Sequence, residues 1–195
     1  MTIAILVGLG CGLVLTLLLL IYFLPDKVQY IETITVEAPI KRVYDAIRYQ
    51  EQLMEWSAWP TETNSLCEVA NTDGIVGAQT IFKNKKGKKF GYQEVTELVE
   101  NERVNFYVKS HVAPFEEDVR LDFILKQITE SKTEVNLWFK EKLKKPAFLI
   151  AYFGNIINWV HSMHLKDLGG LKRYVEESKK YAEIYLKYNS NILKL

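Results

Sequence analysis

The sequence predicts an α+β domain in which a curved antiparallel sheet of about seven strands wraps around a long C-terminal helix, behind one N-terminal transmembrane helix. Three observations predict this fold class. Residues 3–24 form an uncharged apolar run, residues 27–141 show mostly a period of two, and residues from 147 onward show a helical period. Consecutive strands joined by short turns favour an antiparallel meander, and the last helix is the long apolar one that can cover its concave face.

Composition excludes several classes of protein. The chain has 195 residues, an ordinary length for one domain, and a formal net charge of +1. A nucleic-acid binder would carry a clear excess of lysine and arginine, so we expect no nucleic-acid partner. The two cysteines, Cys11 and Cys67, are too few for a disulfide-rich scaffold and form no C-x-x-C pair of the kind that binds zinc.

The apolar run predicts a permanent membrane anchor. Its 22 residues, at about 1.5 Å each in a helix, are enough to cross a hydrocarbon core of about 30 Å. A cleaved signal peptide is the alternative, but it would have a basic start, a shorter apolar stretch and a small-x-small cleavage site, which this segment lacks. Lys27, Lys41 and Arg42 follow the run. The positive-inside rule therefore predicts a single-pass protein of the cell membrane with its globular part in the cytoplasm.

Small residues recur at every fourth position of this run. Ala4, Gly8, Gly12 and Thr16 would share one face of the helix. Such small-xxx-small rows let two membrane helices approach closely, which makes a homodimer a hypothesis. The alternative is that small residues are simply tolerated at these positions.

The globular part opens with a strand and two short helices. Alternation over residues 28–36 predicts the strand, residues 40–47 have apolar side chains at helical spacing, and a second helical turn follows around residues 53–60. Six further strands are predicted at residues 66–70, 75–83, 88–99, 102–112, 115–128 and 132–141, and the long helix begins at residue 147. These elements divide the chain into a transmembrane anchor (1–25), a globular domain (26–178) and a polar helical tail (179–195).

Several motifs in this order resemble one protein superfamily. Thr35-Val36-Glu37-Ala38-Pro39-Ile40 is similar to its strand-Ala-Pro-helix opening. Trp56-Ser57-Ala58-Trp59-Pro60 is close to its Trp-Ser-Pro-Trp motif, with alanine in place of the inner proline, and Gly169-Gly170 also fits. Together they resemble the START/Bet v 1-like superfamily, also called SRPBCC or helix-grip proteins, over residues 27–177. Within it, the chain resembles the polyketide cyclase/dehydrase-like and lipid-transport-like subgroup, whose domains often follow a membrane anchor.

The resemblance implies a helix-grip fold with a hydrophobic cavity between the curved sheet and the C-terminal helix. Strand faces rich in aromatic residues, opposite a helix rich in Phe, Ile and Trp, favour the same arrangement. The expected ligand-binding residues are Trp56, Trp59, Phe106, Val108, Phe123, Phe139, Phe148, Tyr152, Ile156 and Trp159. The alternative is that these side chains fill the core and leave no usable cavity.

The sequence lacks the motifs of the common enzyme classes. It contains no Gly-x-Ser-x-Gly elbow, P-loop, dinucleotide fingerprint or His-Glu-x-x-His helix, and we expect no cofactor. Glu94 and Glu117 are candidates for general acid–base work, although solvated strand charges are the simpler interpretation. His161 and His164 are near neighbours on a helix and would need a third ligand such as His111 to hold a metal. No such ligand has motif spacing, so we expect no metal.

Two groups of lysines are candidates for contact with a membrane surface. Lys83, Lys85, Lys86, Lys88 and Lys89 crowd a predicted hairpin, and Lys144 and Lys145 precede the long helix. If both groups face an anionic leaflet, each cation contributes about 1 kcal/mol of attraction. The alternative is an ordinary soluble hairpin tip.

These features predict a membrane-anchored protein that binds a hydrophobic small molecule or lipid in its cavity, with no catalytic set required. Two alternatives remain. One is an enzyme of the cyclase or hydrolase type that uses a pocket carboxylate. The other is a non-catalytic interaction or stress-response protein that acts through its surface and a membrane dimer.

Overall fold

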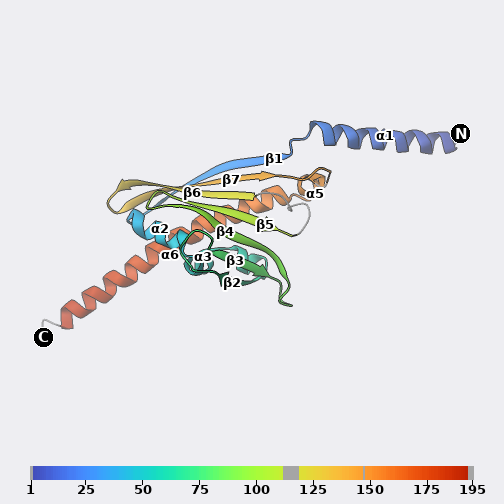
Figure 1. The fold of residues 1–195 in the computed structure, drawn as a ribbon. Coiled ribbons are helices and arrows are strands. Elements are labelled where there is room, and N and C mark those ends of the chain that lie inside the picture. Colours follow the sequence, from blue (N-terminus) through green and yellow to red (C-terminus); the bar gives the residue numbers. More distant parts are fainter. Residues whose placement is uncertain (1, 112–118, 147, 193–195) are drawn as a thin grey trace.

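A computed structural model describes the backbone of residues 2–111, 119–146 and 148–192, and the side chains of these residues apart from residue 4 and residues 178–192. Figure 1 shows the arrangement of the helices and strands. In chain order these are α1 (Thr2–Phe23), β1 (Lys27–Val36), α2 (Ile40–Arg48), α3 (Gln50–Trp56), α4 (Trp59–Glu62), β2 (Leu66–Ala70), β3 (Gln79–Lys83), β4 (Lys89–Val99), β5 (Arg103–Ser110), β6 (Val119–Thr129), β7 (Lys132–Lys142), α5 (Phe148–Phe153) and α6 (Ile156–Ile192).

The strands form one seven-stranded antiparallel sheet in the order β1-β7-β6-β5-β4-β3-β2. Strands β2 to β7 are a meander in which each strand pairs with the next, and β1 pairs with β7 along its whole length. With the long helix α6 across it, this sheet confirms the predicted α+β helix-grip fold.

Three predicted elements differ from the structure. The second short helix, predicted around residues 53–60, is two helices, α3 and α4. Strand β3 begins at Gln79 rather than at residue 75, because Gly74 and Gly77 adopt φ angles of 73° and 90° and form a turn before it. The predicted C-terminal helix is divided into α5 and α6 at Gly154-Asn155, where Asn155 has a φ of 56°. A residue in this left-handed conformation cannot continue an α-helix, and asparagine tolerates it better than most residues do.

Helix α6 lies across the concave face of the sheet and is tied to the edge strand β1. In Figure 1 it passes beneath the strands from the α5 side toward the C-terminus. Three hydrogen bonds join the two elements: Tyr30 Oη to His164 Nδ1 at 2.7 Å, Glu32 Oε1 to His161 Nε2 at 2.6 Å, and Lys172 Nζ to Thr35 O at 2.7 Å. A fourth, from Glu37 N to Glu176 Oε1 at 2.8 Å, joins α6 to the residue that follows β1. These bonds fix the helix along the length of the strand.

Helices α2 and α3 fill one end of the concave face. Phe106, Phe123 and Leu137 from three central strands are at most 1% exposed there, beneath Val43 and Ile47 of α2. The indole of Trp56 lies edge-on to Phe123, with ring centroids 6.3 Å apart, and donates a hydrogen bond of 2.9 Å to the carbonyl of Ala46. This end of the fold is therefore a filled hydrophobic core.

The two motifs that carry the resemblance meet in space where α6 contacts the corner between α3 and α4. Asp167 of α6 accepts hydrogen bonds from Ala58 N at 2.7 Å and Ser57 Oγ at 3.1 Å. One turn further on, the backbone of Gly170 passes so close to α3 that a Cβ atom would lie 2.1 Å from the carbonyl oxygen of Trp56. Only glycine permits this approach.

Helix α1 projects from the sheet end at which β1 begins (Figure 1), and we call this the anchor end. Its segment Ile5–Phe23 has 19 residues and is long and apolar enough to span a membrane, with none of it buried; a signal sequence has the same properties. At its base, Ile21 and Leu24 pack with Phe148 of α5, and Tyr152 donates a hydrogen bond of 2.8 Å to Pro25 O. The length and apolar composition of α1 therefore fit both a membrane anchor and a signal sequence.

The predicted dimer face is open within the described side chains. A Cβ atom on Gly8 or Gly12 would meet nothing within 4 Å, and Thr16 Oγ1 donates a hydrogen bond of 2.9 Å to Gly12 O. The side chain of Ala4 lies outside the described residues. Dimerisation stays a prediction, as does the division of the chain at residues 25 and 178.

The neighbouring glycines of α6 provide a test of the close approach. We expect Gly170→Ala to lower the free energy of unfolding by about 2–3 kcal/mol, because its methyl group would overlap the Trp56 carbonyl. Gly169→Ala is the matched control, since a Cβ atom there meets nothing within 4 Å. It should be neutral or raise stability by up to about 1 kcal/mol through helix propensity. Denaturant unfolding of both variants measures the difference, and equal stabilities would contradict the packing described.

Candidate functional site

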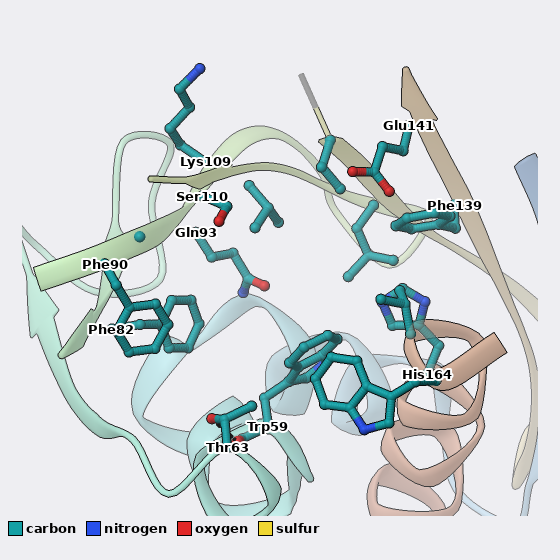
Figure 2. Close-up of a pocket in the computed structure, with 16 residues that line it drawn as sticks. Trp59, Thr63, Phe82, Phe90, Gln93, Lys109, Ser110, Phe139, Glu141 and His164 are labelled. Carbon is teal, nitrogen blue, oxygen red and sulfur yellow. Dashed lines mark hydrogen bonds between the residues drawn. The ribbon is translucent and has the colours of Figure 1, made fainter. Parts of the chain in front are cut away.

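A cavity of about 330 Å³ occupies the anchor end of the concave face, beside the filled core. Its floor crosses β3 to β7, and α4 and α6 form its other wall. Figure 2 shows aromatic side chains on most sides and polar atoms at a few places. The aromatic lining residues are Trp59, Phe82, Phe90, Phe139 and Trp159.

Short side chains leave this space open. The strand pairings place Gly91 opposite Ser110, and Val108 opposite Val119, across the middle of the floor. Further along the same strands, Phe106 lies opposite Leu121 and packs beneath α2. The cavity therefore begins where large floor residues give way to small ones.

The ten predicted ligand-binding residues fall into three groups. Four of them line the cavity: Trp59, Val108, Phe139 and Trp159. Three are buried in the filled core, Trp56, Phe106 and Phe123, and three belong to a separate cluster between α5 and the base of α1, Phe148, Tyr152 and Ile156. The alternation of a strand predicts which side chains face inward, but what covers them depends on where α2 and α6 cross the sheet.

The side chains of two tryptophans form the helix-side wall of the cavity. Trp59 of α4 and Trp159 of α6 meet edge-on with their ring centroids 5.4 Å apart. Trp159 is 42% exposed, so it lies between the cavity and solvent. Across the floor, Phe82 and Phe90 stack with ring centroids 6.3 Å apart. Apolar ligand atoms would contact aromatic faces at both ends of this space.

Glu141 places a buried carboxyl group in the cavity wall. It is 7% exposed, and the strand pairings set it between Val28 of β1 and Val119 of β6. Its Oε1 atom has no hydrogen-bond partner among the described residues. Because burial penalises the charged form, the pKa of Glu141 is raised to about 7.

His164 is the second buried titratable group of the cavity, and it is 3% exposed. Its Nδ1 atom lies 2.7 Å from the hydroxyl of Tyr30, and its ring centroid lies 4.9 Å from that of Phe139. Burial, together with the neighbouring His161, lowers the pKa of His164 to about 3. Burial also raises the pKa of Tyr30, helped by the charges of Glu141 and Glu32. Both groups are therefore neutral near pH 7.

Both helix histidines hold α6 against β1. His161 bonds to Glu32 and its ring centroid is 4.4 Å from that of Tyr30, while His164 bonds to Tyr30 itself. Among the described residues, no three His, Cys, Asp or Glu side chains are grouped as metal ligands would be.

The carboxylate at the cavity is not one that the sequence singled out. Glu94 alternates with the inward-facing Gln93 and Val95, so it lies on the convex face, where its Oε2 atom accepts a hydrogen bond of 2.6 Å from Gln79. Glu117 lies outside the described residues. Glu141 follows Leu137 and Phe139 at intervals of two or four residues, and both of these face inward. The alternation of side chains along β7 could therefore have predicted that Glu141 faces the concave side.

Gln93 closes the cavity toward the filled core. Its Nε2 atom donates a hydrogen bond of 3.2 Å to Gln50 Oε1, which also accepts one of 3.1 Å from Thr80 Oγ1. All three side chains are buried. This polar group separates the two halves of the concave face.

The lysines that were predicted to face a membrane all lie at the anchor end of the sheet. The pairings connect the start of β4 through β5, β6 and β7 to the start of β1. The β3–β4 hairpin and the end of β7 therefore both lie at the anchor end. Lys83, Lys85, Lys86, Lys88 and Lys89 belong to this hairpin, and Lys144 and Lys145 follow β7. Lys83 pairs with Glu68, and Lys145 Nζ lies 5.6 Å from the ring centroid of Phe148.

Comparisons with known proteins identify relatives of this fold. A model of the family described as activator of Hsp90 ATPase homolog 1-like protein matches residues 37–148. No curated protein matches the sequence.

Solved structures share the fold at low sequence identity. A protein of Nitrosospira multiformis is 16% identical, with a TM-score of 0.55 over 78% of this chain and 99% of that one. A protein of Chromobacterium violaceum is 20% identical, with a TM-score of 0.53 over 78% of this chain and 99% of its own. Major latex-like protein 151 of Panax ginseng is 14% identical, with a TM-score of 0.51 over 78% of this chain and 97% of its own.

The buried carboxyl group predicts a particular dependence of stability on pH. Because the pKa of Glu141 is raised from 4.5 to about 7 on folding, the folded state favours the proton, and this contribution to stability is lost as the pH rises through about 7. We expect Glu141→Gln to gain about 2 kcal/mol relative to the unaltered protein between pH 5 and pH 8. Asp167, whose pKa burial also raises to about 7, contributes in the same direction in both proteins.

Urea unfolding followed by tryptophan fluorescence measures this difference. Glu134→Gln is the matched control, because it makes the same change on the same strand at a position that alternates with the inward-facing residues. A stability difference for Glu141→Gln that stays constant from pH 5 to pH 8 would show that the carboxyl group does not titrate in this range.

Proposed function

The chain belongs to the activator of Hsp90 ATPase homolog 1-like family, within the START/Bet v 1-like (SRPBCC) superfamily, and we propose that it is a membrane-anchored binding protein for a hydrophobic small molecule or lipid. The observation that carries this proposal is the cavity of about 330 Å³ between the sheet and α6. Cavities of this size with an apolar lining and a few polar groups are typical sites for small apolar ligands.

The packing of the rest of the domain supports this interpretation. Protein interiors are normally close-packed, and the α2 end of the same sheet face is filled in that way. At the anchor end the floor is lined by short side chains such as Gly91 and Val108, while aromatic rings stand at the margins. A ligand would restore the contacts that these side chains lack.

The position of the cavity supports a role at a membrane. The cavity, both groups of lysines and the apolar helix α1 lie at the anchor end. Ile150 and Phe153 of α5 are 58% and 71% exposed beside the base of α1. We propose that residues 1–25 span the cell membrane, that residues 26–178 form the binding domain in the cytoplasm, and that residues 179–195 are a polar tail.

A cavity-filling variant tests the binding function. We expect an apolar ligand to be recovered by solvent extraction and native mass spectrometry of the purified full chain. Val108→Trp should reduce its amount at least tenfold, because the indole would occupy the middle of the floor. Ile31→Trp is the matched control, since Ile31 is 51% exposed on the convex face. An empty protein that is indifferent to added lipid, or equal occupancy in both variants, would count against a binding function.

The membrane anchor has its own test. We expect the protein to resist alkaline extraction from membranes and to retain residues 1–25, so that its intact mass is that of the full 22.7 kDa chain. Leu13→Arg combined with Leu17→Arg should release it, because an arginine at the centre of a span costs about 2.5–3.5 kcal/mol. Arginine substitutions at the exposed Ile31 and Ile128 of the sheet are the control. A mature protein that lacks the first 25 residues would instead indicate a signal sequence.

A second candidate is an enzyme of the cyclase or hydrolase type. Glu141 is a titratable carboxyl group in the cavity wall, and a pKa of about 7 suits a general acid or base near neutral pH. In that case the ligand recovered from Glu141→Gln would differ chemically from the ligand recovered from the unaltered protein. Identical ligands from the two proteins favour binding alone.

A further inference from the structure

We propose that Glu141 is the polar anchor of the cavity and that the ligand is an amphiphile whose head group donates a hydrogen bond to its carboxylate. A long-chain alcohol or amine has such a head group, whereas a fatty acid at neutral pH does not. This inference rests on the proposed function, because it names the class of ligand for the same site.

The unpartnered oxygen of Glu141 is the first support. Its Oε1 atom is buried and makes no hydrogen bond to the described residues. Figure 2 shows the carboxyl group directed into the cavity from the wall formed by β7. A buried acceptor without a partner is destabilising, and a ligand that supplies a donor at this point removes that cost.

Within the described part of the chain, no basic side chain forms an ion pair with Glu141. Tyr30 on β1, whose pKa is raised by burial and by the charge of Glu141, and His164 on α6, which lines the same cavity, bond to each other. Glu141 also lines a shallow hollow that contains four basic residues, Lys27, Arg120, Lys140 and Lys142. Among the described residues, none of the four forms an ion pair with it. The burial that raises its pKa to about 7 is therefore not offset by a neighbouring charge.

The opposite wall fits the apolar part of such a ligand. Figure 2 places Phe82 and Phe90 across the cavity from Glu141, with Trp59 on the side of the helices. An extended chain with its head at β7 would lie along the valine-lined floor and end against the stacked rings. The cavity thus has one polar end and one aromatic end.

The charge of the head group decides which amphiphiles bind. Above pH 7 the carboxylate accepts a charge-assisted hydrogen bond from either an ammonium or a hydroxyl group, and only the ammonium group adds the attraction of an opposite charge. A ligand carboxylate would instead place two negative charges together in a buried site, which is strongly unfavourable. The expected order of affinity is therefore amine, then alcohol, then acid.

Three probes with the same chain test this order: decylamine, decanol and decanoate, titrated at pH 8 into the full chain in nanodiscs of phosphatidylcholine. The fluorescence of Trp59 and Trp159 reports binding, since both residues line the cavity. We expect decylamine to bind at least tenfold more tightly than decanoate. Glu141→Gln should reduce this ratio to about one, as required by the loss of the charge, while decanol still binds.

The controls separate this inference from the proposed function. Glu134→Gln, on the other face of β7, should leave the ratio of decylamine to decanoate unchanged. If the three probes bind equally, or decanoate binds best, Glu141 is not the anchor, although the binding function stands. If no probe binds and Val108→Trp changes nothing, the proposed function fails as well.

Discussion

The position of α6 across the sheet is the constraint on which the rest of the structure depends. Hydrogen bonds between α6 and the side chains of Tyr30 and Glu32 hold the start of the helix against the edge strand β1, and the bond from Lys172 Nζ to Thr35 O holds its middle. Contact between Gly170 and the Trp56 carbonyl brings the helix against the α3–α4 corner. Because both attachments are short and directional, α6 cannot move toward the floor and close the space beneath it.

This placement divides the concave face into two halves with different properties. At one end α2 packs into the strands and leaves a dry core around Phe123, whereas at the anchor end the wide gap between α6 and short floor side chains leaves the cavity. The same contacts account for the unusual chemistry of its wall. They bury His164 so that it remains neutral, and they enclose Glu141 away from water, with its Oε1 atom unpaired within the described part of the chain.

The sheet register gives this cavity its orientation within the chain. Since β1 starts immediately after α1 and pairs with β7 in full, the carboxyl end of β7 must lie beside the apolar helix. In the antiparallel meander, the β3–β4 hairpin and its lysines also lie at the anchor end. If α1 spans the bilayer, a ligand that enters or leaves the cavity at the anchor end would be close to the membrane. Ligand binding and membrane anchoring would then occur at the same end of the domain.

The sequence by itself determined the apolar segment, the number and order of strands, and the face to which each strand side chain points. Hydrophobic periodicity records these properties because they depend on neighbours within a few residues. The alternation of side chains along β4 and β7 could have excluded Glu94 from the concave face and placed Glu141 on it. Only the tertiary structure decided that β1 pairs with β7, that Phe106 is core while Val108 lines a cavity, and that Glu141 Oε1 has no hydrogen-bond partner among the described residues. Those outcomes depend on distances between elements far apart in the chain, which no local pattern contains.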